Sequence, residues 1–299
     1  MGRFEYENRL MRDREKAFIH SLKQSGATFG IGDDGVEIDN YVVASDAFFE
    51  DVHFKRVWGD LSDIVEKCFL VNLSDIYAMH AIPRFVLLTL TLPKEFKGVA
   101  NLAKIIGECA LKYSVKIIGG DTITADKLHF SLTVLGEKQG RILTRKGIKK
   151  GDILGYISPK SILTGLKTQS FGRNAKMLKN ALRFNKHKKI QNNTRFAKPL
   201  LYPKMLFELN RIARAGMDIS DGIFMELPRL SRLNRLGFKM LKVKGDWLYS
   251  PEEYQMLYAI PKNKLKKMQN LAFKHRHFFI PFAKSVRGRF KETKKNWHC

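Results

Sequence analysis

Aspartates recur along this sequence, several of them beside glycines, in the stretches IGDDGVEID, VVASD, GGDT and MDISDG. Asp75 adds one more carboxylate, inside the apolar pattern of a predicted helix. Each aspartate, taken alone, suits a turn or a helix N-cap. Carboxylates at the ends of several strands, however, converge on one face of a sheet, where hard divalent cations such as Mg²⁺ relieve their mutual repulsion. The full set is Asp33, Asp34, Asp46, Asp75, Asp121, Asp218 and Asp221.

A Mg²⁺ site predicts a phosphate-bearing substrate. Mg²⁺ keeps several waters and usually bridges a few carboxylates to the phosphate oxygens of a substrate. The sequence contains no GxxxxGK[ST] loop and no kinase-type glycine loop followed by a catalytic HRD. The common arrangements for binding ATP are therefore excluded, and a less common one must hold the phosphates.

The net charge also favours a polyanionic ligand. The chain has 54 Lys and Arg against 29 Asp and Glu, a formal net charge of +25. Nucleotides, nucleic acid and acidic membranes would all be attracted by this charge. Because no Arg-rich motif with interleaved aromatic residues accompanies it, we interpret most of the basic residues as solvated helix faces and do not expect a nucleic-acid partner.

The cysteines and the apolar runs indicate in which cellular compartment the protein is expected. Cys68, Cys109 and Cys299 show no CxxC spacing, so neither a disulfide framework nor a zinc site is indicated. The N-terminal stretch is charged throughout, and no apolar run approaches the roughly 18 residues of a membrane helix. We expect a cytoplasmic protein with no signal peptide and no membrane span.

Hydrophobic periodicity predicts the elements that must position the aspartates. YVVAS, RFVLLTLTLP, VKII and LHFSLTVLG read as strands, and the last two flank GGDTITAD, which is interpreted as a turn. Helices are predicted at residues 61–79 and 101–113. After the basic, glycine-containing RKGIKKGD, we expect a helix near 199–214, the turn GMDISDG, a helix to about 235, a strand near 238–243, and two short helices between 251 and 274. FFIPFAKSV predicts a strand interrupted by proline.

The order of the motifs indicates a family. IGDDG, ASDAFFEDVHF, VNLSDIYAMHAIP, GGDT, TRKG, MDISDG and the terminal NWHC resemble the successive motifs of the thiamine-monophosphate kinases. That family belongs to the superfamily of aminoimidazole ribonucleotide synthetase and selenophosphate synthetase. The resemblance runs over nearly the whole chain and implies an α/β (α+β) fold of two domains, residues 1–146 and 147–299. It also implies a homodimer whose N-terminal strands help to form a barrel, with ATP and several Mg²⁺ ions in the groove between the domains.

The resemblance assigns roles to individual residues. It implies that the seven aspartates are metal ligands, with Ser45 lending an oxygen beside Asp46. It places ATP at Gly120, Asp121, Arg145 and Ser220, and thiamine monophosphate at His53, Glu252 and Trp297. These residue types fit, because Arg forks onto phosphate oxygens, Trp stacks on a cationic ring and Glu accepts from an aminopyrimidine. Each also has a plain structural interpretation: Arg145 suits a solvated linker, Trp297 a packed tail residue and His53 a satisfied core histidine.

Three departures from the family pattern leave alternatives open. Ala44 stands where the family usually has Ser or Thr, ISPKSILTGLKT replaces a glycine-rich loop, and SPEEY replaces GGEDY. The lost glycines reshape loops that approach phosphate. Another ATP-dependent enzyme of the superfamily, or a degenerate basic nucleic-acid-binding paralogue, therefore remains an alternative. Selenophosphate synthesis is disfavoured, because residues 1–40 contain no cysteine.

The implied reaction is in-line transfer of the γ-phosphoryl group of ATP to the phosphate of thiamine monophosphate. The acceptor oxygen is already ionised near neutral pH, so no general base is needed. The barrier lies in bringing two polyanions together, which metal ions and cationic donors lower by screening and alignment. We therefore interpret His53 as a binding residue and expect no side chain to act as a catalytic acid or base.

Overall fold

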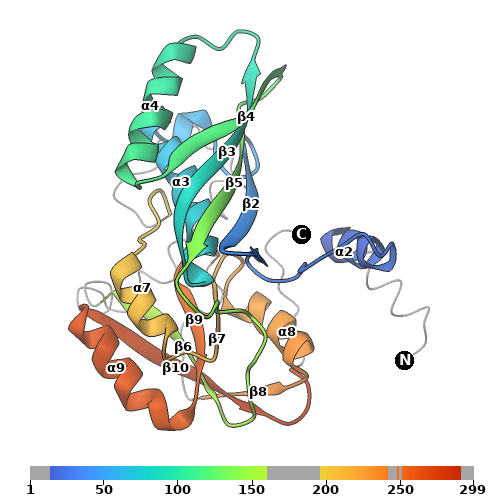
Figure 1. The fold of residues 1–299 in the computed structure, drawn as a ribbon, viewed down its shortest axis with the longest axis vertical. Helices are drawn as coiled ribbons and strands as arrows, with labels where there is room; N and C mark the ends of the chain where they lie inside the picture. The colour runs from blue at the N-terminus through green and yellow to red at the C-terminus, as the bar shows by residue number, and fades with distance from the viewer. Residues whose placement is uncertain (1–13, 160–195, 242–247, 249–250, 291–299) are drawn as a thin grey trace.

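A computed structural model describes residues 14–159, 196–241, 248 and 251–290 (Figure 1). Its core consists of two five-stranded sheets, one formed before residue 140 and the other after residue 150. Figure 1 shows the first sheet with α3 and α4 in the upper half of the view, and the second sheet with α7, α8 and α9 in the lower half. The expected mixed α/β fold with two sheets is confirmed.

The first sheet has the strand order β1-β2-β5-β3-β4. Neighbouring strands are antiparallel except for β3 and β4, which are parallel. The helix α4, Val99–Lys112, supplies the crossover that a parallel pair requires. The strand bounds are β1 Val36–Ile38, β2 Tyr41–Phe49, β3 Ala81–Pro93, β4 Lys116–Ala125 and β5 His129–Lys138.

Only one face of this sheet is covered within the described residues. Val42, Ala44 and Phe48 alternate along β2 toward the helices and are buried. The opposite face carries apolar side chains that remain open: Leu87 on β3 is 40% exposed and Ile123 on β4 is 50% exposed. We call this surface the bare sheet face.

The second sheet is antiparallel throughout, in the order β7-β9-β6-β10-β8. Helices α7 and α9 pack on one of its faces and α8 packs on the other, because alternate residues of β6 point into two different cores. The strand bounds are β6 Ile153–Pro159, β7 Ala215–Asp218, β8 Gly237–Met240, β9 Met256–Ile260 and β10 His277–Val286. The helix bounds are α7 Pro203–Asn210, α8 Ile223–Asn234 and α9 Leu265–Lys274.

Helix α3, Leu61–Ala78, lies between the two sheets and is buried over most of its surface. Its two unexpected polar residues, Asn72 and Asp75, both have an explanation in the structure. The side-chain amide of Asn72 donates to the carbonyl of Cys68 at 2.9 Å, and its Oδ1 accepts from the backbone of Asp46 at 3.2 Å. Asp75 lies one turn further on and points into the cavity described below. The interruption of the apolar pattern therefore marks the side of α3 that contributes to the site.

Smaller elements complete the described chain. Helix α2, Arg14–Gln24, stands apart from both sheets in Figure 1, and two 3-10 turns, η1 Arg56–Trp58 and η3 Lys262–Lys264, connect longer elements. None of the described helices is long and apolar enough to cross a membrane.

Several predictions about elements were wrong or incomplete. GMDISDG is not wholly a turn, because its first residues to Asp218 belong to strand β7. GGDTITAD is not a turn, because its residues to Ala125 continue β4 and pair with β3, in keeping with the β-branched residues Thr122, Ile123 and Thr124. Residues 256–260, expected in a short helix, form the buried strand β9. The segment of residues 153–159, for which no element was predicted, is β6, and the helix expected at 199–214 shortens to α7 with Pro203 at its first turn.

Candidate active site between the two sheets

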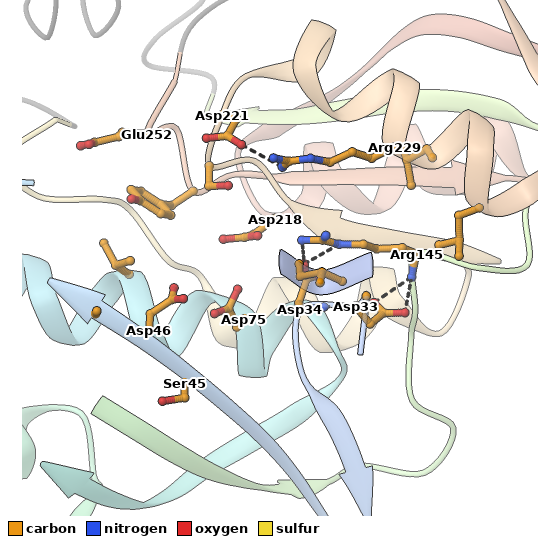
Figure 2. A pocket seen from close by; sticks show the side chains of 18 of the residues that line it. Asp33, Asp34, Ser45, Asp46, Asp75, Arg145, Asp218, Asp221, Arg229 and Glu252 are labelled. Atoms are coloured by element: carbon orange, nitrogen blue, oxygen red, sulfur yellow. Dashed lines mark hydrogen bonds and ion pairs between the residues drawn. The ribbon is translucent and has the colours of Figure 1, made fainter. Parts of the chain in front are cut away.

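A cavity of about 840 Å³ lies between the sheets, beside α3 (Figure 2). It is lined by segments far apart in the sequence, including the loop before β1, the middle of β2, α3 and the turn after β7. Most of the predicted site residues line it: Asp33, Asp34, Ser45, Asp46, His53, Asp75, Arg145, Asp218, Ser220, Asp221 and Glu252.

Three of the predicted aspartates meet in this cavity. Asp34, Asp75 and Asp218 each offer a carboxylate oxygen within 4.8 Å of the other two. We call these three residues the carboxylate trio. They come from the loop before β1, from α3 and from the last residue of β7, so the two sheets must both be in place for the trio to form.

Keeping the three carboxyl groups of the trio charged costs free energy, because they are buried close together. Burial raises the pKa of Asp75 well above its usual value, and the charges of Asp218 and Asp46 raise it further. Burial likewise raises the pKa of Asp218 well above its usual value, although the Ser74 hydroxyl, which donates to its Oδ2 at 2.7 Å, opposes this. Burial raises the pKa of Asp34 to about 6 against the attraction of Arg145. Without a cation, burial therefore disfavours the charged forms of these carboxyl groups.

The chemistry of the trio fits a hard divalent cation. Carboxylate oxygens are the ligands that Mg²⁺ prefers, and one of them, Asp34 Oδ2, is buried with no hydrogen-bond partner among the described residues. A buried acceptor without a partner is costly, and a bound cation would satisfy it. Asp46 extends the acidic lining on the side of β2.

Arg145 is fixed against the trio. Its Nε donates to Asp34 Oδ1 at 2.8 Å, its Nη2 contacts the same oxygen, and its backbone N–H donates to Asp33 Oδ1 at 3.0 Å. Burial is the largest influence on Asp33 and raises its pKa, while hydrogen bonding to Arg145 lowers it. Asp33 therefore anchors the Arg145 backbone, and Arg145 presents a positive charge to the cavity beside Asp34 (Figure 2).

The cavity also has a basic side that sequence reasoning missed. Arg229 on α8 forms ion pairs with Asp221 at 2.8 Å and with Glu226 at 3.1 Å. Arg232 lies one turn further along α8, and His20 and Lys23 of α2 line the same cavity. The only signal in the sequence is that Arg229 and Arg232 stand three apart on a helix that begins directly after MDISDG.

The remaining lining residues have structural partners of their own. Glu252 accepts from Lys67 Nζ at 2.6 Å, and the backbone N–H of Phe49 donates to His53 Nδ1 at 3.0 Å. His53 in its neutral form therefore carries its proton on Nε2. The hydroxyls of Ser45 and Thr133 are hydrogen-bonded at 2.9 Å.

Two predicted site residues are absent from the lining of the cavity, and a third lies outside the described residues. Gly120 and Asp121 lie on the exposed edge strand β4 and are absent from its lining, and Asp121 Oδ1 accepts from the backbone of Thr122 at 2.8 Å. Trp297 lies outside the described residues. Their assigned roles stay predictions.

Comparison with known proteins first defines the class. Residues 32–137 match the family described as AIR synthase related protein, N-terminal domain. The structure of AaThiL complexed with AMPPCP and TMP has the same fold, with a TM-score of 0.73 at 22% identity over 94% of this chain and 95% of that one. The HypE–HypF complex is also similar, with a TM-score of 0.67 at 18% identity over 94% of this chain and 97% of that one. Residues 32–137 thus carry a domain of the AIR synthase related family, and the chain has the fold seen in AaThiL.

Sequence relatives define the particular family. The thiamine-monophosphate kinase of Salmonella typhimurium is 30% identical over 261 residues, covering 78% of this chain and 76% of the relative. That of Buchnera aphidicola subsp. Schizaphis graminum is 28% identical over 283 residues, covering 85% and 83%. The chain belongs to the thiamine-monophosphate kinase family, as the order of its motifs predicted.

Proposed function

We propose that this chain transfers the γ-phosphoryl group of ATP to the phosphate of thiamine monophosphate, giving thiamine diphosphate and ADP. The observation that carries the proposal is the carboxylate trio, which faces a cavity that basic side chains also line. Buried carboxylates beside cations are the arrangement that metal-assisted phosphoryl transfer requires. Family membership supports the choice of substrates, as does the AaThiL structure, which holds AMPPCP and TMP.

Mg²⁺ would be held by the carboxylate trio, with Asp33, Asp46, Asp121 and Asp221 as further predicted ligands. When bound, it supplies charge neutralisation and alignment for phosphate oxygens. The fit rests on the donor set and on the unpartnered Asp34 Oδ2. Several ions, rather than one, are proposed because the acidic lining extends from Asp34 along Asp46 to Asp221.

The side chains around the trio orient and screen the phosphates. Asp34 and Asp33 hold Arg145 in place. Its guanidinium is therefore already positioned before the phosphates bind. Arg229, Arg232 and Lys23 add positive charge to the lining of the cavity, where two polyanionic substrates must approach each other. The attacking phosphate oxygen is ionised near neutral pH, so no residue needs to remove a proton from it.

The acceptor is assigned to the side of the cavity near His53 and Glu252. His53 offers its Nε2 proton, because Nδ1 is already bonded to the backbone. Glu252 is oriented by Lys67 and lines the cavity, where its carboxylate suits a cationic or amino-bearing ring. Trp297 is retained as a proposed stacking residue, and Gly120 and Ser220 as proposed ATP contacts.

Assembly as a cytoplasmic homodimer is part of the proposal. The bare sheet face exposes Leu87, Ile123 and Phe49 side by side with the polar residues of β5, and apolar surface of this kind favours association. Asp121 lies on the same sheet, so its assigned role depends on what covers this face.

The deciding experiment is a coupled assay for thiamine diphosphate with ATP, Mg²⁺ and thiamine monophosphate. We expect turnover with this acceptor and none with thiamine itself, because the attacking group is a phosphate oxygen. Absence of thiamine diphosphate, together with turnover of another phosphorylated acceptor, would assign the chain to a different reaction of the superfamily. Absence of any ATP turnover, with strong salt-dependent binding to duplex DNA, would favour the degenerate paralogue.

A further inference from the structure

A second, smaller cavity adjoins the main one. It has a volume of about 30 Å³, and His53 lines both cavities. Its walls are mainly aromatic and are supplied by Phe48, Phe54, Trp58 and Phe196. We call it the side cavity. Its volume is about that of one water molecule in the liquid, so it admits the edge of a ligand rather than a whole ring.

The side cavity contains two polar atoms that the described residues leave without a partner. Trp58 is 5% exposed, and its Nε1–H is a buried donor with no acceptor. Asp63 Oδ2, in the first turn of α3, is a buried acceptor with no donor. Both residues line the side cavity. Unsatisfied buried groups are rare in native proteins because each one costs stability, which points to a ligand as the missing partner.

Two further polar side chains in the wall have partners, because His53 Nδ1 accepts from the backbone of Phe49 and Lys67 forms an ion pair. Lys67 Nζ donates to Glu252 at 2.6 Å and lies 3.7 Å from the centroid of the Phe196 ring. Lys67 is therefore not the partner that Asp63 lacks. The side cavity thus offers one donor and one acceptor between aromatic walls, beside an ion pair that faces the main cavity.

We propose that the side cavity binds the polar edge of an aminopyrimidine. Such an edge presents a ring nitrogen that accepts, next to an amino group that donates, which complements Trp58 Nε1–H and the Asp63 carboxylate. The proposal rests on the proposed function and assigns this edge to the acceptor, thiamine monophosphate. The location favours the acceptor, because His53 lines the side cavity and Glu252 is paired with Lys67 in its wall. Arg145, Arg229 and Arg232 line only the main cavity.

Adenine has the same donor and acceptor edge, so the test must separate the two substrates. We would compare the parent with Trp58→Phe, which removes the N–H but keeps a ring, and with Asp63→Asn. Each protein is assayed with thiamine monophosphate against its 4-oxo analogue, and with ATP against ITP. In both analogues a carbonyl replaces the amino group, which reverses donor and acceptor. Asp60→Asn, at the same helix start but outside the side cavity, is the control.

We expect the parent to prefer thiamine monophosphate over the 4-oxo analogue by at least about tenfold in kcat/KM, because a reversed edge leaves buried groups unpaired. Each variant should raise the KM for thiamine monophosphate about tenfold or more and lose most of that preference. The preference for ATP over ITP and the KM for ATP should stay within about twofold of the parent. Asp60→Asn should behave like the parent throughout.

Other outcomes would overturn the proposal. An unchanged acceptor preference in both variants would show that Trp58 and Asp63 do not contact this ring. A change confined to the ratio of ATP to ITP would place the adenine there instead. A lower melting temperature with unchanged kinetics would make both residues structural. If the parent forms no thiamine diphosphate at all, the proposed function itself has failed, and ligand-induced shifts in melting temperature with 4-aminopyrimidine compounds would then test the side cavity alone.

Discussion

At the scale of single residues, the carboxylate trio opposes stability in the absence of metal. Three acceptors from separate segments are packed within 4.8 Å, and burial disfavours their charged forms. A turn or cap aspartate does the reverse, because its side chain satisfies a nearby backbone N–H. The two interpretations of these residues, functional and structural, therefore predict opposite effects when one of them is neutralised.

Asp75→Asn should abolish most kinase activity and leave the metal-free protein as stable as the parent or more stable. The amide removes one buried charge from the trio without changing its volume, and functional residues are commonly kept at some expense of stability. Melting temperatures in EDTA and with Mg²⁺ and nucleotide would measure this. Ligand should stabilise the parent more than the variant, in proportion to binding by the folded state.

Asp39→Asn is the matched control for this substitution, because Asp39 is exposed and lies outside the cavity. It should change neither activity nor the stabilisation by Mg²⁺. Clear destabilisation of Asp75→Asn in EDTA, with activity retained at a permissive temperature, would return Asp75 to a structural role.

The trio also sets the pH dependence of stability. The pKa of Asp34 is raised from 3.8 to about 6, so the folded state binds its proton more tightly than the unfolded chain does. The contribution of this group to stability is therefore fully present below about pH 4 and is lost as the pH rises through about 6. In EDTA, the melting temperature should contain a component that falls over this range. Mg²⁺ should oppose the fall, and a profile that is the same with and without Mg²⁺ would contradict the prediction.

Residue types and positions were sufficient to predict the trio from the sequence, but not its basic surroundings. Asp34, Asp75 and Asp218 each interrupt or end an apolar run, so their burial could be anticipated. Arg229 and Arg232 could not be selected, because the chain has 54 basic residues and a helix places many of them in solvent. Trp58 and Asp63 were missed for a related reason. An unpaired buried atom is recognised only when its surroundings are known.

At the scale of elements, α3 connects the two sheets through side chains on several sides. Ser74 Oγ donates to Asp218, and the Tyr77 carbonyl accepts from Asn210 at 3.0 Å. Lys67 pairs with Glu252, with side chains only 6% and 13% exposed. One helix thus fixes both the metal side and the proposed acceptor side of the cavity.

Lys67→Met should lower the free energy of unfolding by about 3 to 5 kcal/mol, because it removes the cation that forms an ion pair with the largely buried Glu252. The double variant Lys67→Met with Glu252→Gln should recover much of this loss. Urea unfolding of the parent, both single variants and the double variant would give the coupling energy.

The exposed pair of Lys104 and Glu108 provides the comparison, with side chains 74% and 65% exposed and 3.9 Å between the charged atoms. Lys104→Met should change stability by less than about 1 kcal/mol. If Lys67→Met is equally mild, the ion pair does not hold α3 to the segment around Glu252.

Elements whose apolar residues repeat at one clear spacing were predicted correctly. Helices α3 and α4 and the proline-interrupted β10 were confirmed, because periodic apolar spacing is a local property. The predicted strand stopped before GGDT, because GGDT was interpreted as a turn. The rest of β4 is fixed by its pairing with β3. Helix α4 separates these two strands in the sequence, so a local pattern does not reveal the pairing. Strand β9 is buried on both faces, and a short, continuously apolar run cannot be distinguished from a buried helix segment by its period.

At the scale of the whole molecule, the bare sheet face provides a test of the proposed dimer. Leu87→Lys places a charge in the middle of that face, and should shift the protein from dimer to monomer in sedimentation velocity. It should also make the melting temperature lower than that of the parent at equal concentration, because association stabilises the folded state by mass action.

Leu111→Lys is the control, because Leu111 is 78% exposed and lies on α4, on the covered side of the sheet. It should leave the oligomeric state unchanged. A parent protein that sediments as a monomer at all accessible concentrations would refute the dimer, whatever the variants do.

The packing around α3 has a consequence for how the chain unfolds. One continuous hydrophobic core contains Val42 and Phe130 of the first sheet together with Ile157 and Tyr258 of the second. Neither sheet can lose its structure without uncovering apolar surface of the other, so the two parts should melt in one cooperative calorimetric transition rather than in two. A fragment ending near residue 146 would expose the side of α3 that faces the second sheet, and we expect it to aggregate rather than fold alone.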